Sequence, residues 1–421
     1  MSSLPASPMS VIEPLPASPA STQIHARPDA LTVLIAAPGL DAGAADAGAV
    51  ELTRVLAGAG HAAIVAARAG RFVADVTAAG GEFVAVDLAS NNPMLMLRNA
   101  AALIRLARER KCDAIHALGR SAGWSALIAA RLCGIPFVTS WYKGFREQNL
   151  FKHAYNGVMA RGDRVIVQSE QIAQLVHDRY GTPWERITVV PASIDFARFD
   201  PARVSRERVQ ALRAAWGVTS ETKVILVTGR ILRRKGHDVV VRAAKRLKET
   251  KLKDFLFVFV GEDRGHTRYT GELWDLVLST GTIDAVRMAA PVYDMPAAYA
   301  CASVVVSAAV QPEGLQRAIV EAQAMARPVI VSDLAAGPEV VLTPPAVPES
   351  RITGLRVQAG DDAALAAALL RLFSMPEPVR DTIGLRGREW VLGHFNADGV
   401  AKQILALYGA TVPHRIKTNE I

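Results

Sequence analysis

Residues 303–333, SVVVSAAVQPEGLQRAIVEAQAMARPVIVSD, predict a strand, a loop, a helix and a second strand. Residues 303–307 and 328–332 are short β-branched runs of the kind found in fully buried strands. Between them, residues 315–325 follow a helical pattern that would bury Ile319, Ala322 and Met325 on one face. Two buried strands joined by a helix form a βαβ unit, which indicates a parallel sheet.

Two glutamates in this stretch, Glu313 in the loop and Glu321 in the helix, are eight positions apart. If helix connects them, a rise of about 1.5 Å per residue separates them by about 12 Å. A glycosidase pair needs about 5–9.5 Å, so the two carboxylates would instead hold separate parts of one elongated ligand. The helix N-terminus at Leu315–Arg317 lies between them and attracts phosphate. The spacing alone does not distinguish such a ligand site from two ordinary surface glutamates.

A second phosphate site is predicted after the strand at 223–228, where the chain reads GRILRRKG from Gly229 to Gly236. Glycines at the carboxyl end of a strand allow close approach to the backbone, and the neighbouring cations offer charge to phosphate oxygens; these are Arg230, Arg233, Arg234 and Lys235. Four cations within six residues would repel one another without an anion nearby. A basic surface turn is the alternative.

The first half of the chain alternates strands and helices, which predicts a doubly wound parallel sheet. The expected strands are 31–37, 62–67, 82–86, 113–117, 137–140, 164–168 and 187–190, and the expected helices are 46–57, 95–110, 151–161 and 170–180. Gly43 falls in the loop after the first strand, although no G-x-G-x-x-G fingerprint is present. His116 ends the fourth strand and Arg120 lies in the loop beyond. A packed histidine is the plainer interpretation of His116.

The length of 421 residues suggests two α/β domains. We expect a Pro-rich, disordered leader at 1–29, a first domain at 30–201, a second at 202–384 and C-terminal helices at 385–421. No run of 18 uncharged apolar residues is present. Cys112, Cys133 and Cys301 match no metal spacing or disulfide framework, which fits a reducing cytoplasm.

The net charge of +8 favours an acidic ligand or an anionic membrane surface. Nucleic acid is not expected, because aromatic residues are few and no basic stripe interleaves with them. The helix near 95–111 is basic and amphipathic, a pattern typical of helices that make peripheral contact with the inner face of a membrane. An ordinary helix that covers a sheet is the alternative.

The segment EGLQRAIVEAQAMARPVIVSD resembles the E-x7-E signature of family 4 (group 1) retaining glycosyltransferases, and the resemblance extends over about residues 31–410. It implies a GT-B fold, in which two Rossmann-like domains face a central cleft and the C-terminal helices return to the first domain. In this family the first Glu meets the donor sugar and the second meets the ribose. The resemblance also selects Arg230 and Lys235 as diphosphate ligands. Relatives of this type usually serve bacterial surface-polysaccharide or lipopolysaccharide synthesis.

The chain departs from the family pattern at several positions. Gln316 and Ala326 stand where relatives have glycine, Ala44 replaces the second glycine after Gly43, and no histidine lies near Tyr142 and Lys143. A catalytically weak or inactive relative that binds sugar nucleotides is therefore the alternative to an enzyme.

The leading expectation is a metal-independent, retaining glycosyltransferase that moves a sugar from a nucleotide-diphosphate sugar to a glycan or lipid-linked acceptor. No D-x-D motif is present to hold a metal, and no cofactor beyond the donor substrate is expected. The catalytic residues would be Glu313, Arg230 and Lys235. The donor-binding residues would be Gly229, Gly236, Leu315, Gln316, Arg317, Glu321 and Gly43, and the acceptor-side residues His116, Arg120, Tyr142 and Lys143.

Overall fold

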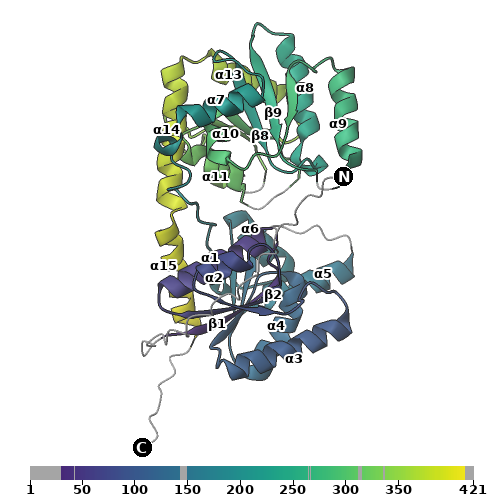
Figure 1. Ribbon diagram of the computed structural model, residues 1–421, viewed down its shortest axis with the longest axis vertical. Coiled ribbons are helices and arrows are strands. Elements are labelled where there is room, and N and C mark those ends of the chain that lie inside the picture. Colours follow the sequence, from purple (N-terminus) through teal and green to yellow (C-terminus); the bar gives the residue numbers. More distant parts are fainter. Residues whose placement is uncertain are drawn as a thin grey trace, which may run out of the picture.

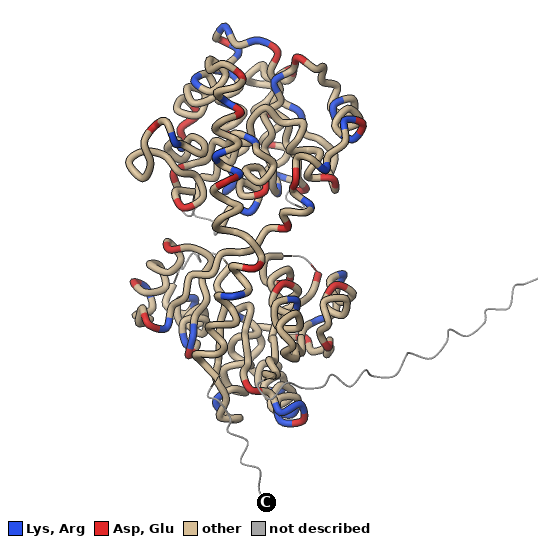
Figure 2. Tube along the Cα trace, turned by 90° about the vertical axis from the view of Figure 1, so that its left-hand side faces the viewer, with Lys and Arg blue, Asp and Glu red and all other residues tan. Residues whose placement is uncertain are grey.

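A computed structural model describes residues 30–41, 43–142, 149–263, 265, 267–311, 315–334 and 337–412. Two parallel sheets dominate it, each covered by helices on both faces (Figure 1). We call the first sheet with its helices the first unit, and the second sheet with its helices the second unit. Charged residues of both signs are spread along the chain in both units (Figure 2). The predicted α/β class with two doubly wound sheets is confirmed.

The sheet of the first unit has seven strands in the order β3-β2-β1-β4-β5-β6-β7, and every pairing is parallel. The order reverses beside β1, which is the topological switch point typical of ligand-binding α/β sheets. Its strands are β1 (Thr32–Gly39), β2 (Ala62–Arg68), β3 (Glu82–Ala85), β4 (Ala114–Ala117), β5 (Phe137–Trp141), β6 (Arg164–Val167) and β7 (Ile187–Val189). Its helices are α1 (Ala44–Gly58), α2 (Val73–Ala78), α3 (Pro93–Glu109), α4 (Arg120–Cys133), α5 (Leu150–Asn156) and α6 (Glu170–Tyr180).

The second unit repeats this plan with six parallel strands in the order β10-β9-β8-β11-β12-β13. The strands are β8 (Lys223–Thr228), β9 (Phe255–Val260), β10 (Val286–Ala289), β11 (Val304–Ser307), β12 (Val329–Ser332) and β13 (Leu355–Val357). The helices are α7 (Arg206–Ala215), α8 (His237–Lys248), α9 (Thr267–Ser279), α10 (Met295–Cys301), α11 (Arg317–Ala324), α12 (Gly337–Val340) and α13 (Asp362–Ser374). The predicted strand–helix–strand stretch is β11, α11 and β12.

Strand β8 shows why continuous apolar runs became central strands. Ile225 and Val227 point into one hydrophobic cluster beneath α8, while Val224 and Leu226 point into another that contains the apolar face of α11. Successive side chains of a strand face opposite sides, so a strand covered by helices on both sides must be apolar at every position. The predicted helix face is also confirmed, since Ile319, Ala322 and Met325 are buried.

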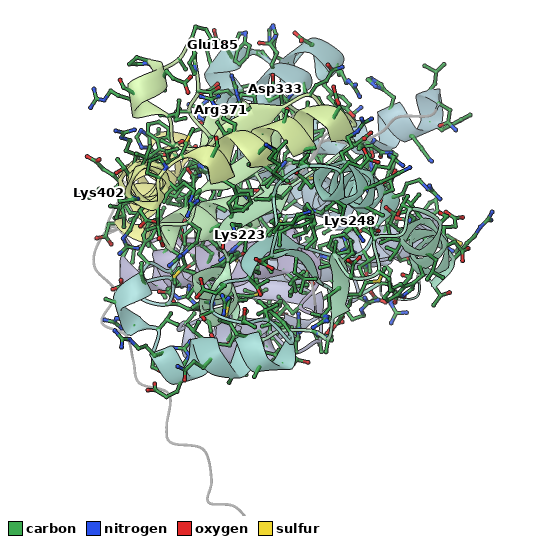
Figure 3. The ribbon with its side chains drawn as sticks, turned by 90° about the horizontal axis from the view of Figure 1, so that it is seen from above. Glu185, Lys223, Lys248, Asp333, Arg371 and Lys402 are labelled. Carbon is green, nitrogen blue, oxygen red and sulfur yellow. The ribbon has the colours of Figure 1, made fainter. Side chains whose placement is uncertain are left out.

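The chain passes between the units twice. Val190 packs in the first core, whereas Ile194 and Phe199 pack in the second, so the packing changes ahead of residue 201. The long helix α14 (Glu377–His394) packs on the second unit, and α15 (Ala397–Thr411) then packs its apolar face into the first core. Both helices follow one flank of the molecule (Figure 1), and Lys402 of α15 lies at the margin of the view from above (Figure 3).

The carboxyl ends of the two sheets meet where α6 begins. The carboxylate of Glu339, in α12 beyond the end of β12, accepts hydrogen bonds from the backbone N–H groups of Glu170 and Gln171, both at 2.9 Å. These N–H groups belong to the first turn of α6, where free donors and the helix dipole favour a negative charge. Burial raises the pKa of Glu339, and the two hydrogen bonds act against this effect. The contact joins the units on the side of the sheets where ligands bind in such folds.

Several helices differ from the sequence-based expectation. A loop was expected at Arg120, but this residue is the first of α4, which follows Gly119 directly. The helix expected at 151–161 is a short α5 followed by a 3-10 turn at Gly157–Arg161. Helices α2, α4, α8, α9 and α10 were not predicted. Helix α4 was not predicted because it contains many small residues, which weaken the apolar periodicity on which such a prediction depends.

Ala326 adopts a left-handed conformation (φ 53°) just past the end of α11, at one of the positions where the family has glycine. This backbone region costs an L-residue about 1 kcal/mol or more. We therefore expect Ala326→Gly to raise the free energy of unfolding by up to about 1 kcal/mol. The greater conformational entropy of glycine in the unfolded chain offsets part of this gain. Thermal unfolding would measure the change. Ala326→Val is the control and should destabilise the protein, because a β-branched residue tolerates this conformation poorly; a lower Tm for the glycine variant would refute the explanation.

Candidate functional site

The loop after β8 is fixed in place by its two predicted glycines. Gly229 (φ 116°) and Gly236 (φ 68°) both have backbone conformations that favour glycine. A Cβ at Gly236 would overlap the backbone carbonyl of Ala308, just past the end of β11. The N–H of Val310 also donates to the carbonyl of Arg234 at 3.0 Å. The loop is therefore docked against the segment that leads towards α11.

The positive charges of this loop are not equivalent. Lys235 is half-buried and its aliphatic chain lies against Gly229. Burial, and then the nearby charges of Arg234 and Arg230, lower the pKa of Lys235 to about 8. Arg233 instead forms an ion pair with Glu272 and lies over the ring of Tyr269 at 4.9 Å. Arg230 is exposed.

The second part of the site is the start of α11, whose N-cap residue is Gln316. The side chain of Gln316 is only 6% exposed, yet neither its amide nitrogen nor its amide oxygen has a hydrogen-bond partner among the described residues. Leu315 packs against the core of the second unit, and Arg317 is the first residue of the helix. A buried amide at a helix N-terminus provides a donor, an acceptor and a favourable dipole for a ligand.

Glu321 is held from two sides. The hydroxyl of Tyr299 donates to Glu321 Oε2 at 2.9 Å, and Arg317 Nε donates to Oε1 at 3.2 Å. Burial raises the pKa of Glu321, whereas the charge of Arg317 and the hydrogen bonds lower it. Tyr299 also hydrogen-bonds Thr228, the last residue of β8. Tyr299 was not predicted from the sequence, because it lies in α10 and no local pattern links it to Glu321.

Apart from Gly43, which lies in the first unit, the described donor-side residues follow two neighbouring strands of the second unit. Gly229, Gly236, Arg230 and Lys235 follow β8, whereas Leu315, Gln316, Arg317 and Glu321 follow β11, and these two strands are neighbours. Glu313 and Lys143 lie outside the described residues. Within the residues that the structure describes, no group of three or more His, Cys, Asp and Glu side chains could hold a metal ion, and no helix has both the length and the apolar character to cross a membrane.

In the first unit, His116 is buried, and both of its ring nitrogens have hydrogen-bond partners. It is 1% exposed; Nδ1 lies 2.6 Å from the hydroxyl of Tyr408 in α15, and Nε2 lies 2.8 Å from the hydroxyl of Ser140. Burial lowers the pKa of His116 to about 3, so the imidazole is neutral at neutral pH. The structure supports the packed interpretation of His116, with the ring joining β4, β5 and the last helix.

The other predicted residues of the first unit lie around this core. Gly43 (φ 144°) is the N-cap residue of α1. The ring of Tyr142 lies against Gly48 of α1, and burial raises the pKa of its hydroxyl, which hydrogen-bonds Ser140. Arg120 Nη1 donates to Asn156 Oδ1 at 2.7 Å and stands over the ring of Tyr155 at 6.0 Å. These contacts place Tyr142 and Arg120 at the carboxyl ends of β5 and β4.

Two family matches cover most of the chain. Residues 46–198 match Glycosyltransferase Family 4, and residues 222–375 match Glycosyl transferases group 1. The chain therefore carries a glycosyltransferase family 4 domain followed by a glycosyltransferase group 1 domain.

Individual curated proteins and solved structures are also similar to this chain. The D-inositol 3-phosphate glycosyltransferase of Salinispora tropica is 28% identical over 271 residues, which cover 62% of this chain and 54% of that protein. The chain spans about half the length of the curated relatives that it matches. A glycosyltransferase from Rickettsia africae has a TM-score of 0.82 at 24% identity, over 92% of this chain and 100% of that one. HepE from Anabaena, in complex with UDP-glucose, has a TM-score of 0.76 at 19% identity, over 90% and 100%. The two structures share the fold, the expected GT-B arrangement.

The pKa of Lys235 predicts how ligand binding depends on pH. At pH 7 most of this side chain is charged, and at pH 9 only about a tenth of it is. A diphosphate held by Lys235 would stabilise the charged form, so its binding should take up a proton near pH 8. The affinity for UDP should fall by up to about tenfold between pH 7 and pH 9.

Calorimetry at several pH values would measure this dependence. Lys235→Arg is the matched control, because an arginine remains charged throughout the range and should flatten the profile. Identical pH profiles for the two proteins would show that Lys235 does not contact the diphosphate.

Proposed function

We propose that the protein is a retaining glycosyltransferase that uses a nucleotide-diphosphate sugar as donor. The observation that carries this proposal is the placement of Lys235 and Arg230 in a loop docked against the segment that follows β11 and leads towards α11. A leaving diphosphate gains negative charge as its bond to the sugar breaks, and fixed cations with a helix N-terminus stabilise that charge. These residues would do the work that a metal does in other transferases, so the proposed reaction is metal-independent.

The proposed chemistry breaks one bond and forms one. The acceptor hydroxyl oxygen attacks the anomeric carbon, and the bond from that carbon to the diphosphate oxygen breaks, with its electron pair going to the diphosphate. The acceptor proton passes to the departing phosphate oxygen. Attack from the same face as the leaving group gives retention. Glu313 would orient the donor sugar, and Glu321, fixed by Tyr299, would bind the ribose.

The acceptor proposed from the family resemblance is a glycan or a lipid-linked glycan of surface-polysaccharide or lipopolysaccharide synthesis. The names of the matched relatives favour a second candidate, a phosphorylated cyclitol such as D-inositol 3-phosphate.

Peripheral membrane contact through α3 is part of the first candidate. Met94 and Leu97 are 79% and 61% exposed near the start of this basic helix. Flotation with anionic vesicles would test that contact, and no bound fraction at low salt would exclude it.

The test of the function is transfer from a panel of nucleotide-diphosphate sugars to glycan, lipid and cyclitol phosphate acceptors. We expect release of the nucleotide diphosphate together with sugar transfer. Lys235→Ala should weaken donor binding by about 1.5–3 kcal/mol, the range for a charge-assisted hydrogen bond. Tight donor binding with no transfer to any acceptor would instead support the inactive relative.

Gln316 provides a sharper prediction about the donor. Its buried amide lacks a partner, so a donor phosphate or hydroxyl would supply the missing hydrogen bonds. We expect Gln316→Gly to reduce donor affinity by about 1 kcal/mol or more, without lowering the Tm of the ligand-free protein. Calorimetry with UDP-sugars and thermal unfolding would measure both. Higher turnover in the glycine variant would mean that Gln316 obstructs the donor rather than binding it.

A further inference from the structure

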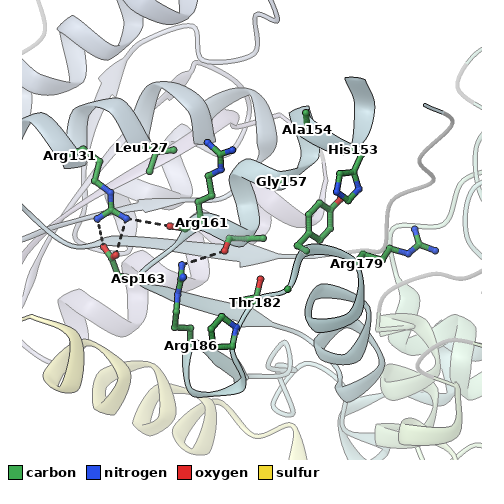
Figure 4. Close-up of a pocket in the computed structure, with 14 residues that line it drawn as sticks. Leu127, Arg131, His153, Ala154, Gly157, Arg161, Asp163, Arg179, Thr182 and Arg186 are labelled. Atoms are coloured by element: carbon green, nitrogen blue, oxygen red, sulfur yellow. Dashed lines mark hydrogen bonds and ion pairs between the residues drawn. The ribbon is translucent and has the colours of Figure 1, made fainter. Parts of the chain in front are cut away.

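The first unit contains a hollow of about 810 Å³ that is separate from the residues considered so far. It is lined by α4, the α5 segment with its 3-10 turn, the end of α6 and the loop that follows (Figure 4). Helix α6 starts beside Glu339, whereas the hollow is bounded by Arg179 and Tyr180 at the other end of this helix. The two ends are about 15 Å apart, so the hollow lies away from the contact between the units.

The lining is strongly basic. The residues that line it include a single carboxylate, Asp163, and four arginines, Arg131, Arg161, Arg179 and Arg186. Arg131 neutralises that carboxylate through two hydrogen bonds, at 2.9 and 3.0 Å. One carboxylate can balance only one of the four positive charges, so the lining keeps an excess of positive charge.

Two of these arginines keep hydrogen-bonding capacity for a ligand. Arg161 lies over the ring of Trp124 at 5.1 Å, and its guanidinium has no carboxylate partner within the described residues. Arg186 donates through Nε to the carbonyl of Gly162 at 3.0 Å, and its Nη1 has no hydrogen-bond partner in the same part of the chain. The backbone contact holds Arg186 in place, and the remaining N–H groups suit phosphate oxygens.

A third observation points to a ligand independently of charge. Thr182 lines the hollow and is 2% exposed, but its hydroxyl has no partner among the residues described. A buried hydroxyl without a hydrogen bond is unfavourable and uncommon in native structures. The main chain at this residue is held by the hydrogen bond from His177 Nδ1 to its carbonyl, at 3.0 Å. A ligand oxygen would satisfy the hydroxyl.

We infer that Arg161, Arg186 and Thr182 form a second binding site, for a ligand that bears a phosphate monoester. The volume fits a small metabolite, and Tyr180, Leu127 and Pro183 provide apolar wall for its uncharged part. A soluble sugar phosphate and the headgroup of phosphatidic acid share this chemistry. The site lies wholly in the first unit and does not depend on the donor site.

The test is calorimetric titration with glucose 6-phosphate, in parallel with flotation on phosphatidylcholine vesicles with and without phosphatidic acid. Arg161→Gln and Thr182→Val should each weaken binding by about tenfold or more. Arg54→Gln, which removes an exposed arginine from α1, is the charge-matched control and should bind as the unmodified protein does. Thr182→Val should unfold at the same or a higher Tm, because it removes an unsatisfied hydroxyl while keeping the side-chain shape.

The outcomes separate this site from the donor site. Lys235→Ala should lose UDP affinity and keep glucose 6-phosphate affinity, whereas Arg161→Gln should do the reverse. Binding to glucose 6-phosphate identifies a soluble ligand, and binding only to vesicles with phosphatidic acid identifies a headgroup. The inference is overturned if neither probe binds, or if binding is equal in the unmodified protein, Arg161→Gln and Thr182→Val.

Discussion

The arrangement of the second unit depends on the close contact between Gly236 and the carbonyl of Ala308. No side chain fits at this point, and the left-handed backbone there also favours glycine. Through this contact the loop after β8 packs against the segment after β11. The cations of the β8 loop therefore lie beside the segment that leads to α11. Helices α8 and α11 both start nearby, and their N-termini add partial positive charge. Backbone packing therefore creates the electrostatic character of the site.

The two units use buried polar groups in different ways. In the second unit, Thr228, Tyr299 and Glu321 form a connected set behind the loops, and this fixes a carboxylate that burial alone would disfavour. In the first unit, the buried His116 links β4 and β5 to Tyr408. The first set orients a charge for a ligand, whereas the second binds the last helix to the sheet.

The sequence predicts what depends on neighbouring positions. Apolar runs predicted the strands of the first sheet and β8, β11 and β12 of the second, and the spacing of glycines and cations predicted the loop from Gly229 to Gly236. The sequence did not predict contacts between residues that are far apart along the chain. Nothing near Tyr299 indicates Glu321, nothing near Glu339 indicates the start of α6, and Thr182 has no local pattern that places it among arginines. Such pairs are set by the three-dimensional path of the chain, which periodicity and motifs do not encode.

The return of α15 to the first unit affects the order of folding during synthesis. Val400, Ile404 and Tyr408 complete the core around β1 and β4, yet they are translated after the whole second unit. Domains generally fold as they emerge from the ribosome, with the N-terminal one first. Here the first sheet emerges early with part of its apolar surface uncovered, and it stays incomplete until the second unit has been made. The nascent chain therefore carries an aggregation-prone surface through most of translation, and its final helix closes that surface.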